Sequence, residues 1–148
     1  MNRNLTIESV MTPKPVGVEA DLKLVRVKEL MESHKIRHLP VTRFGKLVGV
    51  LMERNVKSSR SNPFWDDLNA GDIMDVDPYI VPPEMEVRSV VRDMVDFHLD
   101  FAVVARDESR PVGIFTRQDA MSLLLGRRRS NRKGALRFSP MQRHYEAA

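Results

Sequence analysis

A threonine and an aspartate near the end of the chain have the residue types and the spacing of a small binding site. Thr116 and Asp119 lie three residues apart, directly after the apolar stretch 112–115, where a predicted strand gives way to a predicted helix. From the first turn of that helix both side chains would point the same way, and an ionised aspartate can accept hydrogen bonds from two neighbouring hydroxyl groups. The helix N-terminus also offers unpaired N–H groups and a partial positive charge, which suit a phosphate. The same two residues suit helix capping, so both interpretations stay open on this evidence.

The elements around these residues occur twice in the chain. At a shift of 63 residues, the segment 10–15 aligns with 73–78, and apolar positions after it align as well. One extra residue in the second copy, in the turn 106–110, raises the shift to 64, at which Val48-Gly49-Val50 aligns with Val112-Gly113-Ile114. Two copies are too few for a solenoid. We therefore expect two related units that pack on each other, because neither has enough apolar surface to fold well alone.

The hydrophobic periodicity changes in the same order in both copies and predicts a β-α-β-β-α unit in each. In the first copy we predict a strand at 15–18, a helix capped by Asp21 and ending at 34–35, and strands at 39–41 and 47–51 around a turn at 43–46. In the second copy we predict a strand at 80–81, a helix spanning 87–94, strands at 101–105 and 112–115, and a closing helix at 119–125. The fold class is therefore predicted as mixed α/β.

These segments resemble the CBS (cystathionine-β-synthase) domain family. The similarity rests on Val10-Met11-Thr12-Pro13 and Ile73-Met74-Asp75, on the helix-to-strand turn 36–41, and on the closing turns 49–55 and 113–119. It implies CBS motif 1 at 8–58, a linker at 59–71, CBS motif 2 at 72–125 and a basic tail at 126–148. It also implies a pseudo-two-fold pair of motifs, often dimeric, that binds an adenosine-containing ligand (AMP, ADP, ATP, NAD or S-adenosylmethionine) in the cleft between the motifs and regulates a partner protein.

The resemblance places one usable nucleotide site at the closing turn of the second copy. Thr116 and Asp119 would bind the ribose, and the full pattern of glycine, two hydrophobic residues, Thr-x-x-Asp favours this role over capping alone. The other residues that the resemblance assigns to the site are Ile114, Arg117, Thr12, Pro15, Val16, Arg37 and His38. Two interpretations remain open for each of the last two residues. Arg37 contacts a phosphate, or it is a solvated charge or a member of an ion pair. His38 contacts the ligand, or it has a structural role.

The first copy departs from this pattern. Met52 and Asn55 stand where the second copy has threonine and aspartate, so the site that would use them, together with Pro78, Tyr79 and Phe101, is expected to be weak or empty. Asp100 occupies a position where family members often have a basic residue, and its charge would oppose a polyphosphate. This favours AMP, adenosine or S-adenosylmethionine over ATP.

The composition excludes several kinds of chemistry. The chain has 148 residues and no cysteine, which excludes disulfides, thiolate metal sites and cysteine nucleophiles. Its four histidines have no metal-ligand spacing, and no phosphate-binding glycine loop or nucleophile motif is present. No apolar run reaches about 18 residues. We therefore expect a cytoplasmic protein that is not an enzyme, requires no metal or cofactor and has no membrane partner.

The basic tail is the main alternative source of function. Residues 127–148 contain seven basic residues and one acid, so residues 1–126 carry a net charge of about −2 although the whole chain carries +4. Such a tail could contact nucleic acid or a partner protein on a CBS scaffold that binds no ligand, or it could be a solvated extension. A homodimer is expected from the family resemblance.

Overall fold

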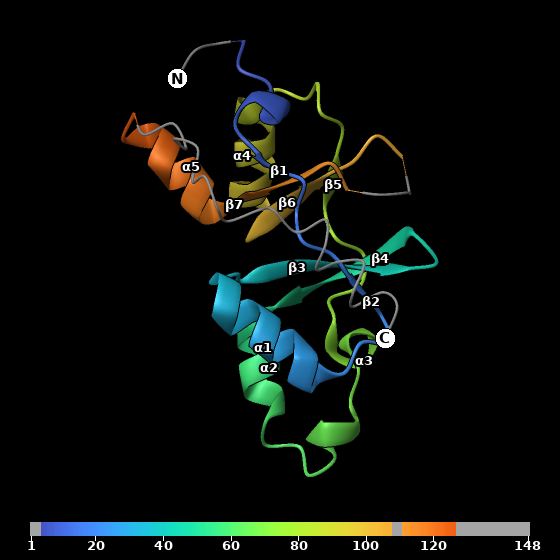
Figure 1. Cartoon of the computed structure of the whole chain (residues 1–148). Helices are drawn as coiled ribbons and strands as arrows, with labels where there is room; N and C mark the ends of the chain where they lie inside the picture. Colours follow the sequence, from blue (N-terminus) through green and yellow to red (C-terminus); the bar gives the residue numbers. More distant parts are fainter. Residues whose placement is uncertain (1–3, 108–110, 127–148) are drawn as a thin grey trace. The chain divides into compact units, whose positions relative to one another are not determined.

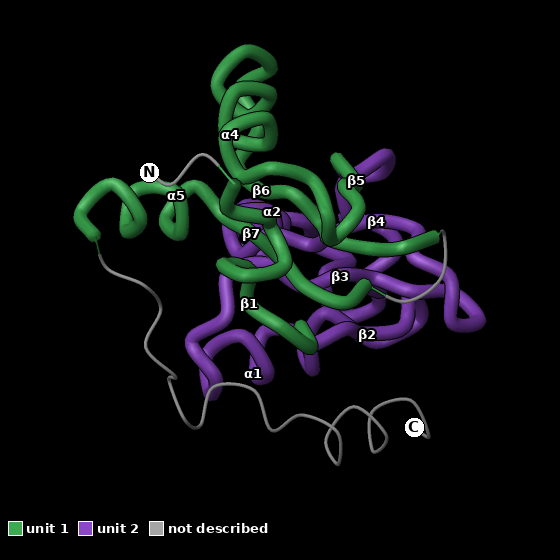
Figure 2. Tube along the Cα trace, turned by 90° about the horizontal axis from the view of Figure 1, so that it is seen from above, with its two compact units in different colours: residues 1–15, 79–134 green, residues 16–78, 135–148 purple. Residues whose placement is uncertain are grey.

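The structure is a computed structural model that describes residues 4–107 and 111–126 (Figure 1). Within these residues the chain forms two compact units (Figure 2). Unit 1 contains residues up to Pro15 and those from Tyr79 onward, and unit 2 contains residues 16–78. The chain therefore begins in unit 1, builds the whole of unit 2 and then returns to complete unit 1.

Unit 2 is a three-stranded sheet with helices packed against it. Its elements are β2 (Val18–Glu19), α1 (Leu24–His34), β3 (His38–Arg43), β4 (Lys46–Met52), α2 (Glu53–Ser59), the 3-10 turn η2 (Trp65–Asp67) and α3 (Ala70–Ile73). The strand order is β2-β3-β4, with β2 parallel and β4 antiparallel to β3. Helices α1 and α2 lie along one side of this sheet (Figure 1). They bury apolar residues such as Leu30 and Val56 in a core shared with Leu39 and Leu51.

Helix α1 shows why the periodicity was informative and where it was not. The side chains of Leu24, Val27 and Leu30 are buried, as the three- and four-residue spacing predicts. The helix ends before Lys35, whose φ of 53° is left-handed. The predicted cap at Asp21 is wrong, because Lys23 pairs with Asn69 in an isolated bridge and adopts an extended conformation. The helix therefore starts only after this bridge.

Unit 1 repeats the arrangement with one additional strand. Its elements are the 3-10 turn η1 (Ile7–Ser9), β1 (Thr12–Pro13), β5 (Ile80–Val81), α4 (Val87–Asp96), β6 (Phe101–Val104), β7 (Gly113–Thr116) and α5 (Arg117–Leu124). The strand order is β1-β7-β6-β5, with β5 parallel to β6 and the other pairs antiparallel. Phe115 is fully buried at the centre of a core that includes Val90 and Ala102.

The fold is the mixed α/β arrangement that the repeat predicts, with a β-α-β-β-α order in each unit. Three details differ. The strand expected at 15–18 is observed only from Val18, as β2, and the additional strand β1 precedes it. The closing helix begins at Arg117 because Thr116 is its cap, and the expected linker contains η2 and the start of α3. In the part of the chain that the structure describes, no helix combines the length and the apolar character needed to cross a membrane.

The pairing of β1 is not apparent from the sequence. Thr12 lies opposite Ile114 of β7, so the opening segment of the chain completes the sheet of unit 1. An equivalent contact occurs in unit 2, where Asp75 forms a bridge with Val50 of β4. The glycine beside each contact has a steric reason. A Cβ on Gly113 would overlap the side chain of Met11, and a Cβ on Gly49 would lie 2.5 Å from the carbonyl oxygen of Asp75 and 2.7 Å from Met74 Sδ.

Candidate functional site

Thr116 and Asp119 form a reciprocal capping box at the start of α5. The Thr116 amide donates to Asp119 Oδ2 at 2.8 Å, and the Asp119 amide donates to Thr116 Oγ1 at 3.3 Å. The Thr116 hydroxyl also donates to Asp119 Oδ2 at 3.0 Å. The Asp119 side chain is buried, at 4% exposure. The capping interpretation is therefore confirmed. The ribose interpretation remains a prediction, and it requires the carboxylate to keep these bonds while it accepts others, for which a carboxylate has about four acceptor sites.

The N–H groups that begin α5 are less available than the sequence suggests. The Arg117 amide donates to the carbonyl oxygen of Asp100 at 2.9 Å, and the Asp119 amide is used by the capping box. The expectation that this helix end offers unpaired N–H donors to a phosphate is therefore wrong for these two amides.

Thr12 is the residue of unit 1 whose polar group is least satisfied. Strand β1 places it opposite Ile114, two residues before Thr116 on the neighbouring strand. Its side chain is 7% exposed, and its Oγ1 has no hydrogen-bond partner among the described residues. A buried hydroxyl without a partner costs roughly 1–3 kcal/mol, so folded proteins rarely leave one unless a water or ligand completes it. The structure thus brings Thr12, Ile114, Thr116 and Asp119 together in one unit.

Arg117 and Asp100 form an ion pair through NH2 and Oδ1. Arg117 is the first residue of α5, and Asp100 directly precedes β6, so the backbone bond between them also holds the side chains close. The pair carries no net charge. The expectation that Asp100 would repel a polyphosphate considered the carboxylate alone; the ion pair weakens this repulsion, and the preference for a ligand with little phosphate charge stays a prediction.

Three predicted site residues belong to unit 2. Arg37 is exposed and makes no ion pair with any residue the structure describes, while its carbonyl oxygen accepts from the Glu53 amide at 2.9 Å. His38 is half-buried at the start of β3, opposite Met52. Val16 is 4% exposed and packs in the core of unit 2. Pro15, at the end of the first segment of unit 1, is half-buried. Their role in a nucleotide site stays a prediction.

The residues of the expected weak site are divided between the units. Met52 is buried at 5% exposure and precedes α2, and the Asn55 amide Nδ2 donates to Asp75 Oδ1 at 3.5 Å. The amide that stands in place of Asp119 is thus in contact with a carboxylate of its own unit. Pro78 is half-buried at the end of unit 2. This weak site also remains a prediction.

Tyr79 and Phe101, the other two residues of that set, belong to unit 1. The Tyr79 hydroxyl donates to Asp93 Oδ2 at 2.5 Å. Burial, and then the bond and charge of Asp93, raise the pKa of Tyr79 well above its usual value, so the hydroxyl stays protonated. Phe101 is 7% exposed and lies opposite Thr116 in the β6–β7 pair.

Sequence reasoning missed the contact of Asp75 with Asn55 and the unpaired hydroxyl of Thr12. The internal alignment contained a signal for both, because the shift of 63 residues places Asp75 on Thr12. No cluster of three potential metal ligands occurs within residues 4–107 and 111–126. The expected contacts of the tail, 127–148, lie outside the described residues.

Comparisons with known proteins identify the repeat. The family model described as "CBS domain" matches twice, at residues 7–61 and 70–126. The uncharacterized protein YlbB of Bacillus subtilis is 37% identical over 71 residues, which are 45% of this chain and 48% of that protein. The zinc metalloprotease MJ0392 of Methanocaldococcus jannaschii is 27% identical over 125 residues, 82% of this chain and 34% of that protein. The chain thus spans about half or less of the length of these two relatives.

Solved structures agree on the fold. The CBS domain pair of protein MJ0100, in complex with 5′-methylthioadenosine and S-adenosyl-L-methionine, is similar with a TM-score of 0.74 at 21% identity and covers 82% of this chain and 96% of its own. CBSX2 in complex with AMP has a TM-score of 0.72 at 21% identity, covering 82% and 97%. The CBS domain of a bacterial CNNM/CorC family Mg2+ transporter in complex with ATP has a TM-score of 0.75 at 21% identity, covering 84% and 90%. With two family matches over most of its length, the chain belongs to the CBS domain family.

Proposed function

We propose that this chain is a regulatory, non-enzymatic module that binds one adenosine-containing ligand and transmits its presence to a partner protein. The observation that carries the proposal is the buried, unpaired Oγ1 of Thr12, which lies on the strand next to the one that ends in Thr116. Similar CBS domain pairs have been solved with AMP, ATP or S-adenosyl-L-methionine. The ligand class is therefore AMP, ADP, ATP, NAD or S-adenosylmethionine.

The chemistry expected at this site is recognition of vicinal hydroxyl groups. Asp119 would accept hydrogen bonds from the ribose, and Thr12 would donate to or accept from a polar group of the ligand. The capping box supports this role because it fixes the orientation of the carboxylate before the ligand arrives. Arg37, which has no ion pair within the described residues, is the candidate to contact a phosphate.

The test is a calorimetric titration of AMP, ATP, NAD and S-adenosylmethionine into the full chain and into Asp119→Asn. The asparagine keeps an acceptor for the cap but loses the charge, so we expect an affinity loss of about tenfold or more. The matched control is Asn55→Ala, the equivalent position of unit 2, which should leave the affinity unchanged. If no ligand binds the wild type, or if Asp119→Asn binds as tightly as the wild type, the proposed site is wrong.

We also propose that the module is a homodimer formed through α4 and α5. These helices of unit 1 expose the large apolar side chains Val95, Phe97, Met121, Leu124 and Leu125, with exposures between 52% and 75% at or next to their ends. Between them lies a groove of about 410 Å³, lined mainly by Val91, Met94, Leu99 and Ala120. An apolar face of this kind is typical of an interface rather than of a solvated surface.

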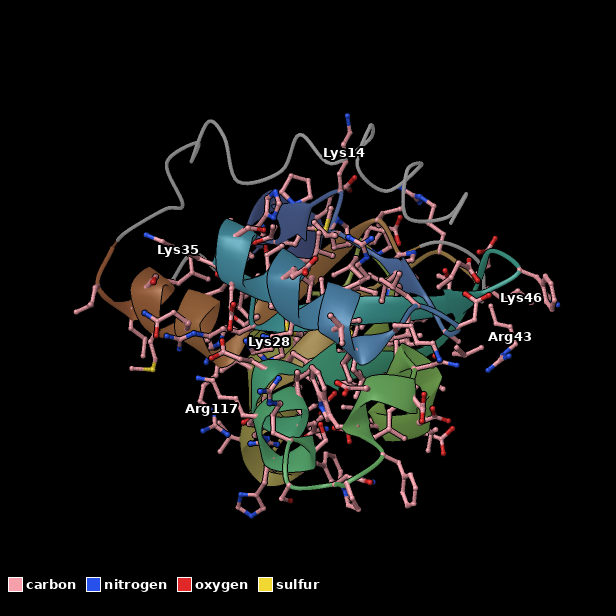
Figure 3. All side chains as sticks on the ribbon, turned by 60° about the horizontal axis from the view of Figure 1, so that its bottom comes forward. Lys14, Lys28, Lys35, Arg43, Lys46 and Arg117 are labelled. Carbon is pink, nitrogen blue, oxygen red and sulfur yellow. The ribbon has the colours of Figure 1, made fainter. Side chains whose placement is uncertain are left out.

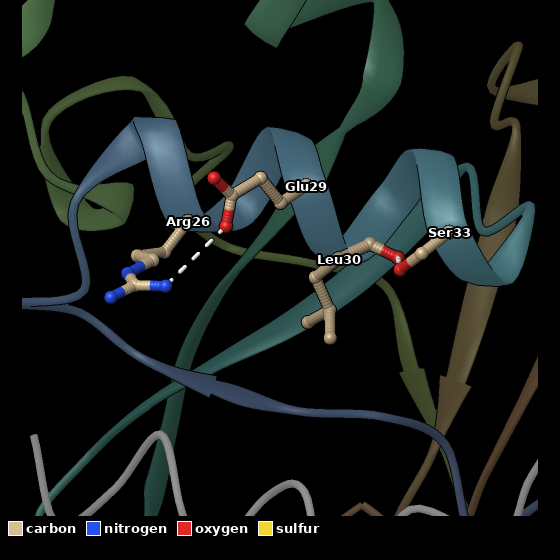
Figure 4. A network of polar contacts seen from close by, with 4 residues as sticks. All are labelled: Arg26, Glu29, Leu30 and Ser33. Atoms are coloured by element: carbon tan, nitrogen blue, oxygen red, sulfur yellow. Dashed lines mark hydrogen bonds and ion pairs between the residues drawn. The ribbon is translucent and has the colours of Figure 1, made fainter.

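The corresponding helix of unit 2 has a different surface. On α1, Arg26 pairs with Glu29 at 3.5 Å, and the Ser33 hydroxyl donates to the carbonyl oxygen of Leu30 at 3.4 Å (Figure 4). Lys28 pairs with Glu32 at 2.9 Å. Such a face is already suited to water, which is why we place the partner protomer of the dimer on α4 and α5.

Light scattering coupled to size-exclusion chromatography tests the dimer. The wild type should have twice the chain mass of 17.0 kDa. Leu124→Glu, which places a charge in the apolar face, should yield a monomer, whereas Val25→Glu on α1 should not. A monomeric wild type, or a Leu124→Glu variant that remains dimeric, would contradict this interface.

A further inference from the structure

The tip of the β3–β4 hairpin is built from residues that neither its backbone nor the interior of unit 2 explains. Phe44 and Gly45 are the two central residues of the turn, with φ of 52° and 78°. Positive φ at both positions is typical of a type I′ turn, in which Asn-Gly and Gly-Gly are favoured. A bulky side chain in this region is unfavourable. Phe44 is nevertheless there, and its side chain is 95% exposed, so packing does not stabilise it.

The residues on either side of this turn are both cationic. Arg43 and Lys46 are directly opposite in the register of the two strands, so their side chains share one face of the hairpin. Like charges in this arrangement destabilise a hairpin. Neither forms an ion pair with a residue in 4–107 or 111–126 (Figure 3). The Arg43 guanidinium lies beside Gly71 of α3, which leaves its charge without an acidic partner. Two other basic residues labelled there are paired, Lys28 with Glu32 and Arg117 with Asp100.

We propose that this hairpin tip, residues 43–46, contacts an anionic lipid surface, with the Phe44 ring inserted and Arg43 and Lys46 on headgroup phosphates. The partner supplies what the isolated tip lacks, because apolar surroundings take up the ring and negative charge relieves the repulsion between the two cations. The proposal goes beyond the ligand site in unit 1 and is independent of it.

The order of the groups favours a membrane over a nucleic acid. The ring is in the two-residue turn, and the paired cations flank that turn at the ends of the strands. A group that enters a bilayer likewise has its apolar part among the acyl chains and its charges at the phosphates. Single-stranded nucleic acid is instead bound in a charged groove that follows its backbone. A two-residue turn is convex and provides no groove. This proposal differs from the sequence-based expectation that the chain has no membrane partner.

The test is co-sedimentation of the full chain with vesicles of phosphatidylcholine that contain about 30% of the anionic lipid phosphatidylglycerol, which gives the surface a negative potential that attracts basic residues. Low salt and a high lipid concentration are used. Phe44→Asn should lower the partition coefficient about tenfold, and Arg43→Gln with Lys46→Gln should lower it about twentyfold. Vesicles of phosphatidylcholine alone should bind little of any variant. Phe64→Asn is the matched control, because Phe64 is also exposed on unit 2, at 68%, but has an ordinary φ of −98°.

A stability measurement separates a lost contact from a damaged fold. Because asparagine tolerates positive φ, Phe44→Asn should raise the melting temperature by about 4 °C while it weakens vesicle binding. Equal vesicle binding by wild type, Phe44→Asn and the double glutamine variant would overturn the proposal, including the case in which residues 127–148 alone bind the vesicles. It would also be overturned if Phe44→Asn lost binding to a fluorescent oligothymidine, measured by anisotropy, but not to the vesicles.

Discussion

Units 1 and 2 share one order of elements, yet they treat the same two positions in opposite ways. In unit 1 the segment that pairs with the closing strand contributes Thr12, and the following helix contributes Asp119. In unit 2 the equivalent residues are Asp75 and Asn55. The carboxylate and the uncharged group have exchanged places. The Asn55 amide contacts Asp75 at 3.5 Å, whereas the Thr12 hydroxyl has no partner among the described residues. The same fold can therefore satisfy these groups internally in one unit and leave one unsatisfied in the other.

The charged pair at the start of the closing helix is exchanged as well. Arg117 and Asp100 form an ion pair in unit 1, and their equivalents in unit 2 are Glu53 and Arg37, joined by the same backbone bond at 2.9 Å. Glu53 pairs instead with Lys57, one turn along α2, at 2.5 Å. A lysine one turn along the helix can therefore leave the guanidinium without an ion pair, because Lys57 competes for the carboxylate that would otherwise hold Arg37.

The largest predicted effect concerns a feature that the units share, the glycine beside the Asp75–Val50 bridge in unit 2 and beside the β1–β7 pair in unit 1. Gly49→Ala should lower the free energy of unfolding by about 3 kcal/mol, because its Cβ would meet the Asp75 backbone oxygen as well as Met74. Gly113→Ala should cost about 1–2 kcal/mol, because it meets only the flexible side chain of Met11. Denaturant unfolding followed by Trp65 fluorescence reports on unit 2, in which Trp65 is buried, and circular dichroism reports on both units.

Double variants provide the control for this comparison. Measured against Met11→Ala, Gly113→Ala should cost little further stability, since the obstructing atoms are gone. The single variant is the reference because Met11 itself packs against the core of unit 1. Met74→Ala should restore little of the loss in Gly49→Ala, since the backbone oxygen remains at 2.5 Å from the added Cβ. Equal rescue in both units would show that the two contacts are sterically the same.

The next variant introduces into unit 2 the aspartate that unit 1 has at the equivalent position. Asn55→Asp should destabilise the protein by about 1 kcal/mol at low salt, because it places two carboxylates in contact with each other near the surface, where solvent screens them. The loss should shrink in 0.5 M salt, at about which the Debye length falls to a few ångströms. Adding Asp75→Thr to Asn55→Asp should remove this loss of stability.

The complete exchange, Met52→Thr with Asn55→Asp and Asp75→Thr, reproduces the residues of unit 1. On the proposed function it should raise the number of ligands bound per chain from one to two, as measured by calorimetry. An unchanged stoichiometry in a folded triple variant would mean that these three positions do not define the site.

A smaller effect is expected from the Arg117–Asp100 pair. Asp100→Asn would release the guanidinium and remove a negative charge, so ATP affinity should rise about fivefold, equivalent to roughly 1 kcal/mol for a charge that solvent partly screens. AMP affinity should change less, since AMP carries fewer charges. The two titrations are compared in the same buffer. An equal change for both nucleotides would show that the pair does not act on phosphate charge.

The sequence predicted the repeat and the helix faces well because these depend on local periodicity. The buried spacing of Leu24, Val27 and Leu30 is visible in the residues themselves, and so is the end of the helix at 34–35. It did not predict that β1 pairs with β7, because that contact joins residues about 100 positions apart and a two-residue strand has no periodicity of its own. The start of α1 failed for the same reason, since a distant bridge from Lys23 to Asn69 overrides the local cap.

The residue types of the site were also readable, but their partners were not. Thr116 and Asp119 were recognised by their spacing, whereas the ion pair of Asp100 with Arg117 and the contact of Asn55 with Asp75 depend on the folded backbone. The charge argument against polyphosphate considered the carboxylate of Asp100 without its partner Arg117, and the preference for a ligand with little phosphate charge stays a prediction.

The smallest predicted effect separates two threonines that are equally buried. Thr12 and Thr42 are both 7% exposed, but the Thr42 hydroxyl donates to Glu19 at 2.8 Å, whereas that of Thr12 has no described partner. Thr12→Val should leave stability unchanged or raise it by up to about 1 kcal/mol, because it removes an unsatisfied buried group. Thr42→Val should lower stability by about 1 kcal/mol, because it leaves Glu19 without its donor. Urea denaturation at pH 7 measures both. A loss of stability in Thr12→Val would mean that water already satisfies its hydroxyl, and the argument for a ligand at this position would then rest on Asp119 alone.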